Sequence, residues 1–273
     1  MSLIISQRIP DGIVVAADSM STAQNLIEFA VRGGETECPK CNEKIKLADL
    51  KFPPVPVPFS ASSYTQKLFP LYGKYAVASF GQGIINGKTI YYHIKQFEKE
   101  NSSPSDLTIV RDSLIKYFEN ELQAEFPDYS KKAPDKWSPV GFHLNGYEKK
   151  QDGKQAGVTY QINLGKENEI NRIDSIGCTI AGEIFLVQKL WEVGKADNRR
   201  VFKYGLFSLQ DAIDLSEFLI NATSNFQRFS NEVPTVGGEV DIALLTPFHD
   251  FQWIKRKQLM EILGAKETNK STK

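Results

Sequence analysis

Apolar residues run through two short segments near the start of the chain, and a turn signal separates them. Residues 2–9 and 13–18 are rich in aliphatic side chains, and Pro10-Asp11-Gly12 lies between them. Gly, Pro and Asp favour tight turns between strands. The pattern predicts an N-terminal β-hairpin whose second strand ends in two alanines and the acid Asp18.

The same strand pattern returns later in the chain. A second hairpin is expected over 66–72 and 74–80, turning at Gly73. Short runs rich in β-branched, aromatic and other apolar residues are typical of strands. They predict the remaining strands at 138–147, 157–164, 169–176 and 240–245.

Helical spacing of apolar residues marks the segments between these strands. We expect helices after Gly83 to about residue 99, over 103–125, 180–194 and 209–229, and over 254–263. Ser208, with Asp211 three residues on, is a capping-box-like start for the helix at 209. The predicted inner faces are Ile85, Ile90, Ile94 and Phe97 for the first helix, and Ile109, Leu114, Phe118 and Leu122 for the second.

The order of these elements is strands, two helices, strands, two helices and a strand. Segregated runs argue against alternating βαβ units and favour an α+β layered sandwich, with helices packed in pairs on antiparallel sheets. We expect a single domain over 1–263 and a disordered polar tail over 264–273. Residues 23–64, with their paired glycines and proline-rich stretch, are predicted to be an irregular insertion.

Composition narrows the class of protein. Lys+Arg and Asp+Glu both number 33 among 273 residues, so the net charge is near zero. This argues against general electrostatic binding to nucleic acid or to an anionic membrane. No run of about 18 apolar residues predicts a membrane span, and no secretory signal pattern opens the chain. Three cysteines in a chain of this length indicate a reducing compartment. We therefore expect a cytoplasmic protein.

The stretch DGIVVAADS, residues 11–19, resembles the DG(V/I)VLAADSRAT signature of proteasome β-subunits and their bacterial relatives, which are N-terminal-nucleophile (Ntn) hydrolases. Other segments resemble that family in the same order: TQKLF at 65–69, ASFG at 78–81, VGF at 140–142, SLQDAI at 208–213 and GGEVDI at 237–242. The resemblance covers most of the chain outside 23–64 and the tail. It implies a four-layer αββα sandwich of two antiparallel sheets flanked by helix pairs.

The resemblance also implies a catalytic set. In the family, the acid of the signature lies sixteen residues after the N-terminal nucleophile, which places the nucleophile here at Ser2. Removal of Met1 would expose the hydroxyl and α-amine of Ser2, and an amine of pKa about 8 can act as general base for that hydroxyl. Lys67 would stabilise negative charge beside the nucleophile, Asp18 would orient Lys67, and the Gly81 N–H would bind the oxyanion.

The implied activity is hydrolysis of a peptide or another amide, with no cofactor. Ser19, Met20, Ser21 and Thr22 would line the cleft, where an extended substrate adds as a strand. The partners implied are a peptide or other amide substrate and further copies of the chain, in a ring or another homo-oligomer. Neither nucleic acid nor a membrane is expected as a partner.

Two departures from the family leave an alternative open. The family's serine before the third helix has no clear counterpart, since Ser175, Thr179 or neither could take its place. The aspartate that follows the fourth helix is missing from the stretch 225–230, which reads NFQRFS. The alternative is a catalytically weak or inactive scaffold subunit that keeps the fold for assembly.

The remaining chemical features of the sequence give weaker indications of function. Cys38 and Cys41 have the C-x₂-C spacing of half a zinc site, but the chain offers no second pair. A knuckle that has lost its metal, a site completed by another subunit and a redox pair all stay open, and no metal is assigned. His143 is interpreted as a core or supporting residue, Trp137, Trp191 and Trp253 as packing residues, and residues 255–257 as a solvated helix face.

Overall fold

The structure is a computed structural model that describes residues 2–27, 35–37, 40–41, 44–46, 55–102, 106–133, 137–149, 153–196, 202–231 and 233–258. Its first large sheet contains the N-terminal hairpin. The strands are β1 (Leu3–Ile9), β2 (Gly12–Ala17), β14 (Gly177–Gly182), β15 (Asp241–Leu245) and β16 (Gln252–Lys255). They follow the order β14-β1-β2-β15-β16, and all neighbours are antiparallel. The predicted hairpin is confirmed, with Ile4 opposite Ala17.

The second large sheet also has five antiparallel strands, in the order β13-β12-β11-β8-β7. They are β7 (Leu68–Leu71), β8 (Tyr75–Gly81), β11 (Val140–Lys149), β12 (Gln155–Leu164) and β13 (Glu169–Ile173). The predicted second hairpin is confirmed as β7 and β8, and Gly73 in their turn has a φ of +65°. That left-handed conformation is one that glycine adopts without steric cost.

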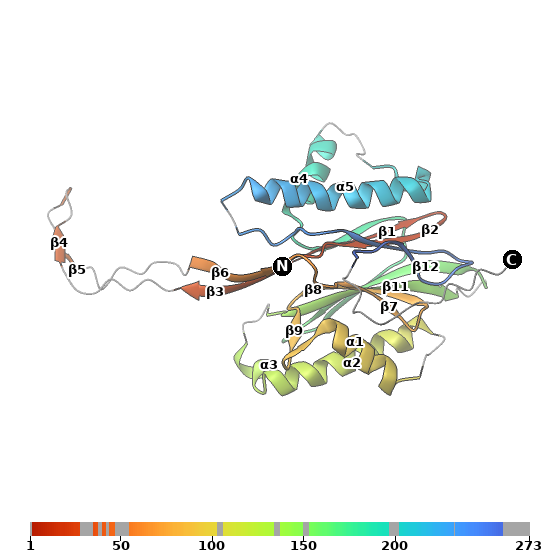
Figure 1. Ribbon diagram of the computed structural model, residues 1–273, viewed down its shortest axis with the longest axis horizontal. Helices are drawn as coiled ribbons and strands as arrows, with labels where there is room; N and C mark the ends of the chain where they lie inside the picture. Colours follow the sequence, from red (N-terminus) through yellow and green to blue (C-terminus); the bar gives the residue numbers. More distant parts are fainter. Residues whose placement is uncertain are drawn as a thin grey trace.

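Helices cover the outer face of each sheet, as Figure 1 shows. α4 (Phe185–Ala196) and α5 (Leu209–Arg228) lie on the first sheet, whereas α1 (Ile90–Glu100) and α2 (Leu107–Glu125) lie on the second. Shorter pieces are the hairpin of β9 (Ile84–Ile85) and β10 (Lys88–Thr89), the helix α3 (Tyr129–Lys132) and a 3₁₀ turn at Tyr204–Leu206. Among the described residues, no helix is long and apolar enough to cross a membrane. The α+β class predicted from the element order is confirmed.

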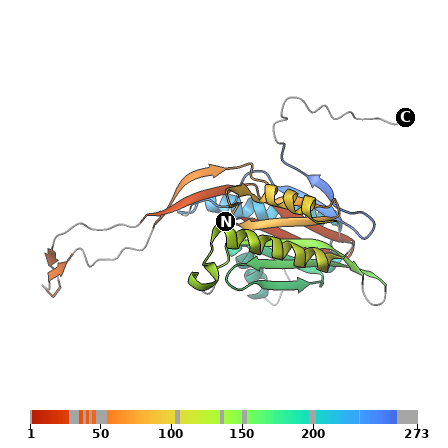
Figure 2. The same ribbon diagram turned by 90° about the horizontal axis from the view of Figure 1, so that it is seen from below.

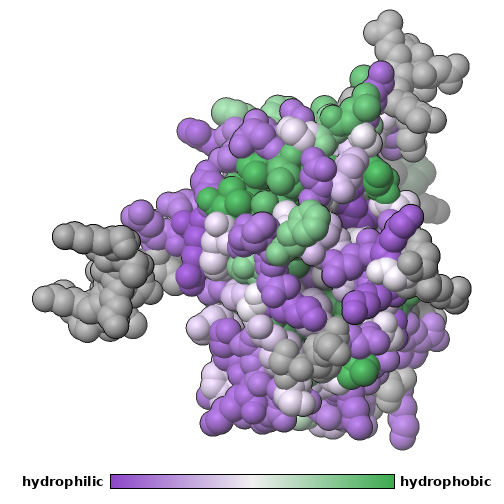
Figure 3. All heavy atoms as spheres, turned by 90° about the vertical axis from the view of Figure 1, so that its right-hand side faces the viewer, coloured by the Kyte–Doolittle hydropathy of each residue, from purple (hydrophilic) through white to green (hydrophobic). Residues whose placement is uncertain are grey.

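Three hydrophobic clusters hold these parts together. One joins α1 and α2 to the second sheet, and another joins α4 and α5 to the first. The third lies between the sheets and is rich in small side chains, among them Ala17, Ala76, Ala78, Ala181 and Ala243. Alanines on both facing surfaces allow the two sheets to approach closely. Figure 3 shows the side of the molecule that lies on the right in Figure 1. On this side, hydrophobic surface gathers mainly in the upper half, where α4 and α5 lie.

Several predicted boundaries are wrong. The helix expected at 180–194 begins only at Phe185, because residues 177–182 pair with β1 as strand β14. The C-terminal helix expected at 254 is absent where the structure describes the chain, since 252–255 form strand β16 on the edge of the first sheet. Ile109, predicted to face inward, is 54% exposed, while Val110 next to it is fully buried.

The segment 23–64 is more regular than predicted. Strand β3 (Ser21–Ile27) pairs antiparallel with β6 (Val55–Ser62), and these two strands, here called the ribbon, run outward from the body (Figures 1 and 2). β4 (Glu35–Glu37) pairs with β5 (Lys44–Lys46). β6 contains Pro56 and Pro58, which a strand tolerates when only one of its edges is hydrogen-bonded. The predicted tail at 264–273 lies outside the described residues.

A buried polar cluster crosses the space between the two sheets. Ser6 Oγ lies 3.0 Å from His143 Nδ1, and Arg8 Nη1 donates to Thr159 Oγ1 at 2.8 Å. Thr159 Oγ1 in turn donates to Asn145 Oδ1 at 2.8 Å. His143 is fully buried, as expected for a supporting residue, and burial together with the positive charge of Arg8 lowers its pKa to about 3.

This histidine is expected to make the fold sensitive to acid. In the unfolded chain His143 protonates near its ordinary pKa of about 6.5, so between that pH and about 3 the unfolded chain binds more protons. The free energy of unfolding should therefore fall by about 2 kcal/mol between pH 7 and pH 5 from this group. Urea denaturation at both pH values measures the fall, and His143→Gln should lose this part of it. An equal fall in both proteins would contradict the assignment to His143.

Candidate active site

A cleft of about 850 Å³ lies between Ser2, which precedes the first strand, and the ends of β3 and β6 at the base of the ribbon. Its walls come from the start of β1, the first residues of β3, the segment that leads into β7, and the end of β8. Six of the eight residues predicted from the sequence line this cleft: Ser2, Met20, Ser21, Thr22, Lys67 and Gly81. The structure therefore brings together segments that lie up to about eighty residues apart.

Asp18 directly follows β2, is completely buried and does not line the cleft. Its Oδ1 accepts hydrogen bonds from Leu3 N at 3.0 Å and from Lys67 Nζ at 2.8 Å. Its Oδ2 accepts from Met20 N and from Gly237 N, both at 3.1 Å. A carboxylate has about four acceptor positions, so these four donors saturate it and fix its orientation.

Lys67 occupies the position just before β7, and only 6% of its side chain is exposed. Its Nζ donates to Asp18 and to the Met20 carbonyl, and its own carbonyl accepts from Ser79 N at 2.8 Å. Burial lowers the pKa of Lys67, Asp18 opposes that shift, and the positive charge of Lys257 adds to it. The ammonium group is thus held beside the cleft by one carboxylate and is easier to deprotonate than an exposed lysine.

Two hydrogen bonds fix the main chain at Ser2 and Leu3. Its carbonyl accepts from Glu183 N at 2.7 Å, and the next N–H, that of Leu3, donates to Asp18. Gly182 allows this approach, because a Cβ there would lie 1.7 Å from the Ser2 carbonyl oxygen and the residue has a φ of +91°. Only 3% of Ser2 is exposed, and what is exposed faces the cleft that Lys67 also lines.

Gly81 ends β8 at the opposite wall. Its φ is +87°, and a Cβ would lie 2.3 Å from the Pro139 carbonyl oxygen, so the backbone itself requires glycine. Ser79 N donates toward β7 at Lys67 O, whereas Gln82 N donates toward β11 at Pro139 O. Because N–H groups alternate along a strand, that of Gly81 points to the same side as that of Ser79, past the start of β7. This is the side on which Lys67 lies.

Ser19 departs from its predicted role. It does not line the cleft and is completely buried. Its Oγ donates to the Glu239 carbonyl at 2.6 Å, and its N–H donates to the Gly237 carbonyl at 2.9 Å. These bonds make Ser19 a structural link, and its buried side chain is not at the cleft to contact a substrate. Thr22, by contrast, stays at the cleft, with its Oγ1 anchored on the Pro234 carbonyl at 2.8 Å.

Gln227 organises the loop that reaches Asp18, and the sequence alone did not single it out. Its Oε1 accepts from Thr235 N and Val236 N, both at 2.9 Å, and its Nε2 donates to Thr235 Oγ1 at 3.1 Å. The next residue, Gly237, donates to Asp18. In the stretch where the resemblance led us to expect an aspartate, a buried amide therefore fixes the loop that donates to Asp18.

The prediction of a solvated helix face at residues 255–257 is wrong, because Lys255 ends strand β16 and no helix follows it in the described residues; Lys255 and Arg256 are exposed, but Lys257 is not. Lys257 is only 3% exposed, and its Nζ contacts Asp241 and Ser19 Oγ rather than solvent. Sequence reasoning missed this pair. The available signal was Asp241, an acid at the start of a strand without an exposed face, because a buried carboxylate needs a partner. Neither Ser175 nor Thr179, the alternatives for the family's serine, lines the cleft.

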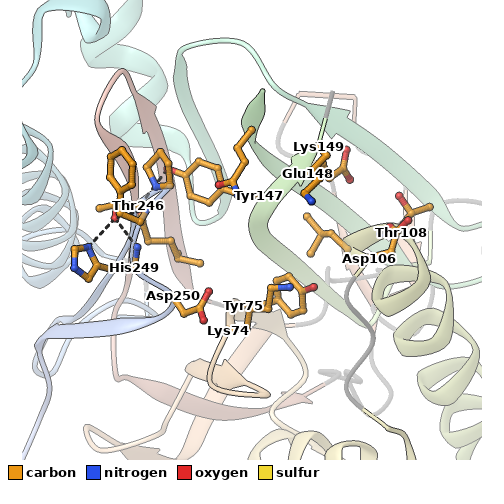
Figure 4. Close-up of a pocket in the computed structure, with 15 residues that line it drawn as sticks. Lys74, Tyr75, Asp106, Thr108, Tyr147, Glu148, Lys149, Thr246, His249 and Asp250 are labelled. Atoms are coloured by element: carbon orange, nitrogen blue, oxygen red, sulfur yellow. Dashed lines mark hydrogen bonds between the residues drawn. The ribbon is translucent and has the colours of Figure 1, made fainter. Parts of the chain in front are cut away.

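A second cavity, of about 500 Å³, lies at the far ends of β8, β11 and β15 (Figure 4). Lys74, Lys149, Asp106, Glu148 and Asp250 contribute to its lining. His249 and Thr246 are hydrogen-bonded to each other at its edge (Figure 4). Charges of both signs surround this cavity and favour neither an anionic nor a cationic ligand, so the candidate catalytic site remains the cleft at Ser2.

The CPKC segment remains incompletely placed. Cys38 lies outside the described residues, and Cys41 is exposed. Among the residues that the structure describes, no group of three or more His, Cys, Asp or Glu side chains is arranged to hold a metal ion. The three interpretations of this segment therefore stay predictions.

In comparisons with known proteins, no family model matches the chain, and no curated protein matches its sequence.

Proposed function

We propose that this protein is an Ntn hydrolase that cleaves a peptide or another amide bond with Ser2 as its nucleophile. The succession of helix pair, sheet, sheet and helix pair supports the four-layer αββα sandwich of that class. Fold alone does not fix a function, so the proposal depends on the site.

One observation carries the proposal. A single oxygen of buried Asp18 accepts from both the Leu3 N–H and Lys67 Nζ, at 3.0 and 2.8 Å. The same carboxylate therefore ties the residue after Ser2 to the lysine, and both Ser2 and Lys67 face one cleft. A buried, saturated ion pair whose lysine lines the same cleft as a serine is an arrangement that a scaffold does not need and a nucleophile can use.

The proposed reaction begins once whatever precedes Ser2 has been removed, leaving a free α-amine. The amine takes the proton of Ser2 Oγ as the oxygen bonds to the substrate carbonyl carbon. The Lys67 ammonium lowers the pKa of that amine and stabilises the negative charge that develops nearby. The Gly81 N–H donates to the tetrahedral oxyanion.

Collapse of the tetrahedral intermediate breaks the C–N bond, and the leaving nitrogen takes the proton from the α-ammonium. An ester then joins Ser2 Oγ to the acyl part of the substrate. Water, activated by the same amine, attacks this ester and releases the acid with Ser2 restored. Every proton in this cycle moves through the α-amine of Ser2.

The cleft favours an extended substrate. Ser21 and Thr22 of β3 form one wall, and Gly81–Gly83 form the other. β3 pairs with β6 along one edge, in a two-stranded sheet, so its other edge has no strand paired with it among the described residues. An extended peptide can pair with such an edge through main-chain hydrogen bonds, so we propose that substrate lies between these walls.

Labelling with an electrophile tests this function directly. A peptide β-lactone or epoxyketone should modify the protein once, and mass spectrometry of the N-terminal peptide should place the adduct on Ser2. The same spectrum shows whether Ser2 is the first residue. A chain that begins at Ser2 and takes no adduct would favour the inactive scaffold over the hydrolase.

A further inference from the structure

A second buried ion pair lies next to the proposed catalytic pair. Lys257 Nζ contacts Asp241 Oδ2, and the backbone N–H of Lys257 donates to Asp241 Oδ1 at 2.8 Å. The two side chains are 1% and 2% exposed, so both charges have been removed from water. Removing a charge from water is strongly unfavourable, and a buried partner offsets only part of that cost. We therefore expect this pair to have a role that an ordinary surface salt bridge does not have.

Ser19 connects this second pair to the first. Its Oγ accepts from Lys257 Nζ at 3.0 Å, and its carbonyl accepts from Thr65 N at 2.9 Å. Thr65 lies two residues before Lys67, and Ser19 itself directly follows Asp18. Lys257 thus fixes Ser19, which adjoins Asp18 in sequence, and Ser19 in turn fixes Thr65, which lies two residues before Lys67.

Strand pairing brings the two carboxylates to the same end of the first sheet. Asp241 at the start of β15 lies opposite Ala17, the residue before Asp18. The Ser19 hydroxyl also donates to the carbonyl of Glu239, which leads into Asp241. The resulting cluster has two cations and two anions: Lys67, Lys257, Asp18 and Asp241.

We propose that Lys257 is a positioning residue for the active site. It fixes Ser19 by a hydrogen bond, and it adds a positive charge to the surroundings of Lys67. The inference rests on the proposed function, because it assigns Lys257 a role in that site. Lys257 lies outside the cleft lining, so it acts through Ser19 and through its field. Among the described residues, the charges that act on the pKa of Lys67 are those of Asp18, which raises it, and Lys257, which lowers it and so favours loss of the Lys67 proton.

Three variants test this role. Lys257→Met removes the charge and the bond to Ser19, and Lys257→Met with Asp241→Asn removes both charges in case the single variant fails to fold. Lys255→Met is the matched control, because Lys255 lies in the same segment and its pair with Glu217 at 2.5 Å is solvent-exposed. Thermal unfolding of each variant shows which of them are folded.

The decisive readout is the titration of Lys67. Its rate of acetylation by a small anhydride, followed by mass spectrometry across pH, gives its titration midpoint without any catalysis. We expect the midpoint to rise by about half a pH unit or more in the folded Lys257 variants and to stay unchanged in Lys255→Met. An unchanged midpoint in a folded Lys257 variant overturns the proposal.

Labelling of Ser2 across pH supplies the second readout. Loss of a neighbouring cation raises the pKa of the α-amine, so the acid limb of the labelling rate should move to higher pH. A merely structural role would lower the rate at every pH without moving the limb. If the wild-type protein takes no label at Ser2 while the Lys67 midpoint still moves, the charge coupling holds and the hydrolase proposal fails.

Discussion

Replacing Ser2 by alanine is expected to reduce hydrolysis of a peptide substrate by at least ~10³-fold, because the substitution removes the oxygen that forms the acyl ester. The fold should survive. The Ser2 carbonyl, which alanine retains, makes the 2.7 Å bond to Glu183, and the Leu3 N–H still donates to Asp18. Initial rates on a fluorogenic peptide amide, together with thermal unfolding, measure both effects.

Ser2→Thr is the matched control for that loss. Threonine keeps the hydroxyl and the α-amine, and its added methyl restricts rotation about χ1. Activity should therefore persist in Ser2→Thr and vanish in Ser2→Ala. Equal activity in the wild type and Ser2→Ala would assign the hydrolysis to another group and leave Ser2 without a catalytic role.

Local pattern predicted the elements nearest this serine well. The hairpin of β1 and β2 follows from two apolar runs and one turn, and all of its strand residues are buried. The resemblance to a known family then placed Lys67 and Gly81 relative to Ser2, and the structure brings all three to one cleft. Their spacing along the chain could not have shown this, because about sixty residues or more separate Ser2 from the other two.

The errors arose where tertiary contacts override local preference. Residues 177–182, GCTIAG, have little helical or strand periodicity, and only pairing with β1 makes them a strand. The ribbon was unforeseen because β3 and β6 are separated by a long stretch of sequence and β6 carries two prolines. Lys257 looked solvent-exposed because its partner Asp241 becomes a neighbour only in the folded sheet.

Loss of Asp18 is expected to have the largest effect on stability. Asp18→Ala should lower the free energy of unfolding by about 3–5 kcal/mol, because it leaves the buried Lys67 ammonium without its counterion. It also removes the acceptor of the Leu3, Met20 and Gly237 N–H groups, and unsatisfied buried donors add to the cost. Urea denaturation gives the magnitude. A loss below about 1 kcal/mol would contradict the buried pair.

A paired replacement separates the structural from the catalytic contribution of this ion pair. Asp18→Asn with Lys67→Met removes both charges and fills the lysine site with an apolar chain. The amide oxygen can still accept from the Met20 and Gly237 N–H groups, whereas the Leu3 N–H loses its acceptor to the amide NH₂. Replacing a buried pair by neutral groups of similar volume is often neutral or stabilising, so the double variant should lose only the ~1–3 kcal/mol of the unpaired Leu3 N–H, less than Asp18→Ala loses. Its hydrolysis should nevertheless fall by about 10²–10³-fold, because no ammonium then stabilises charge beside Ser2. A stable double variant with full activity would show that the pair serves the fold alone, and catalysis would then have to come from groups other than Lys67 and Asp18.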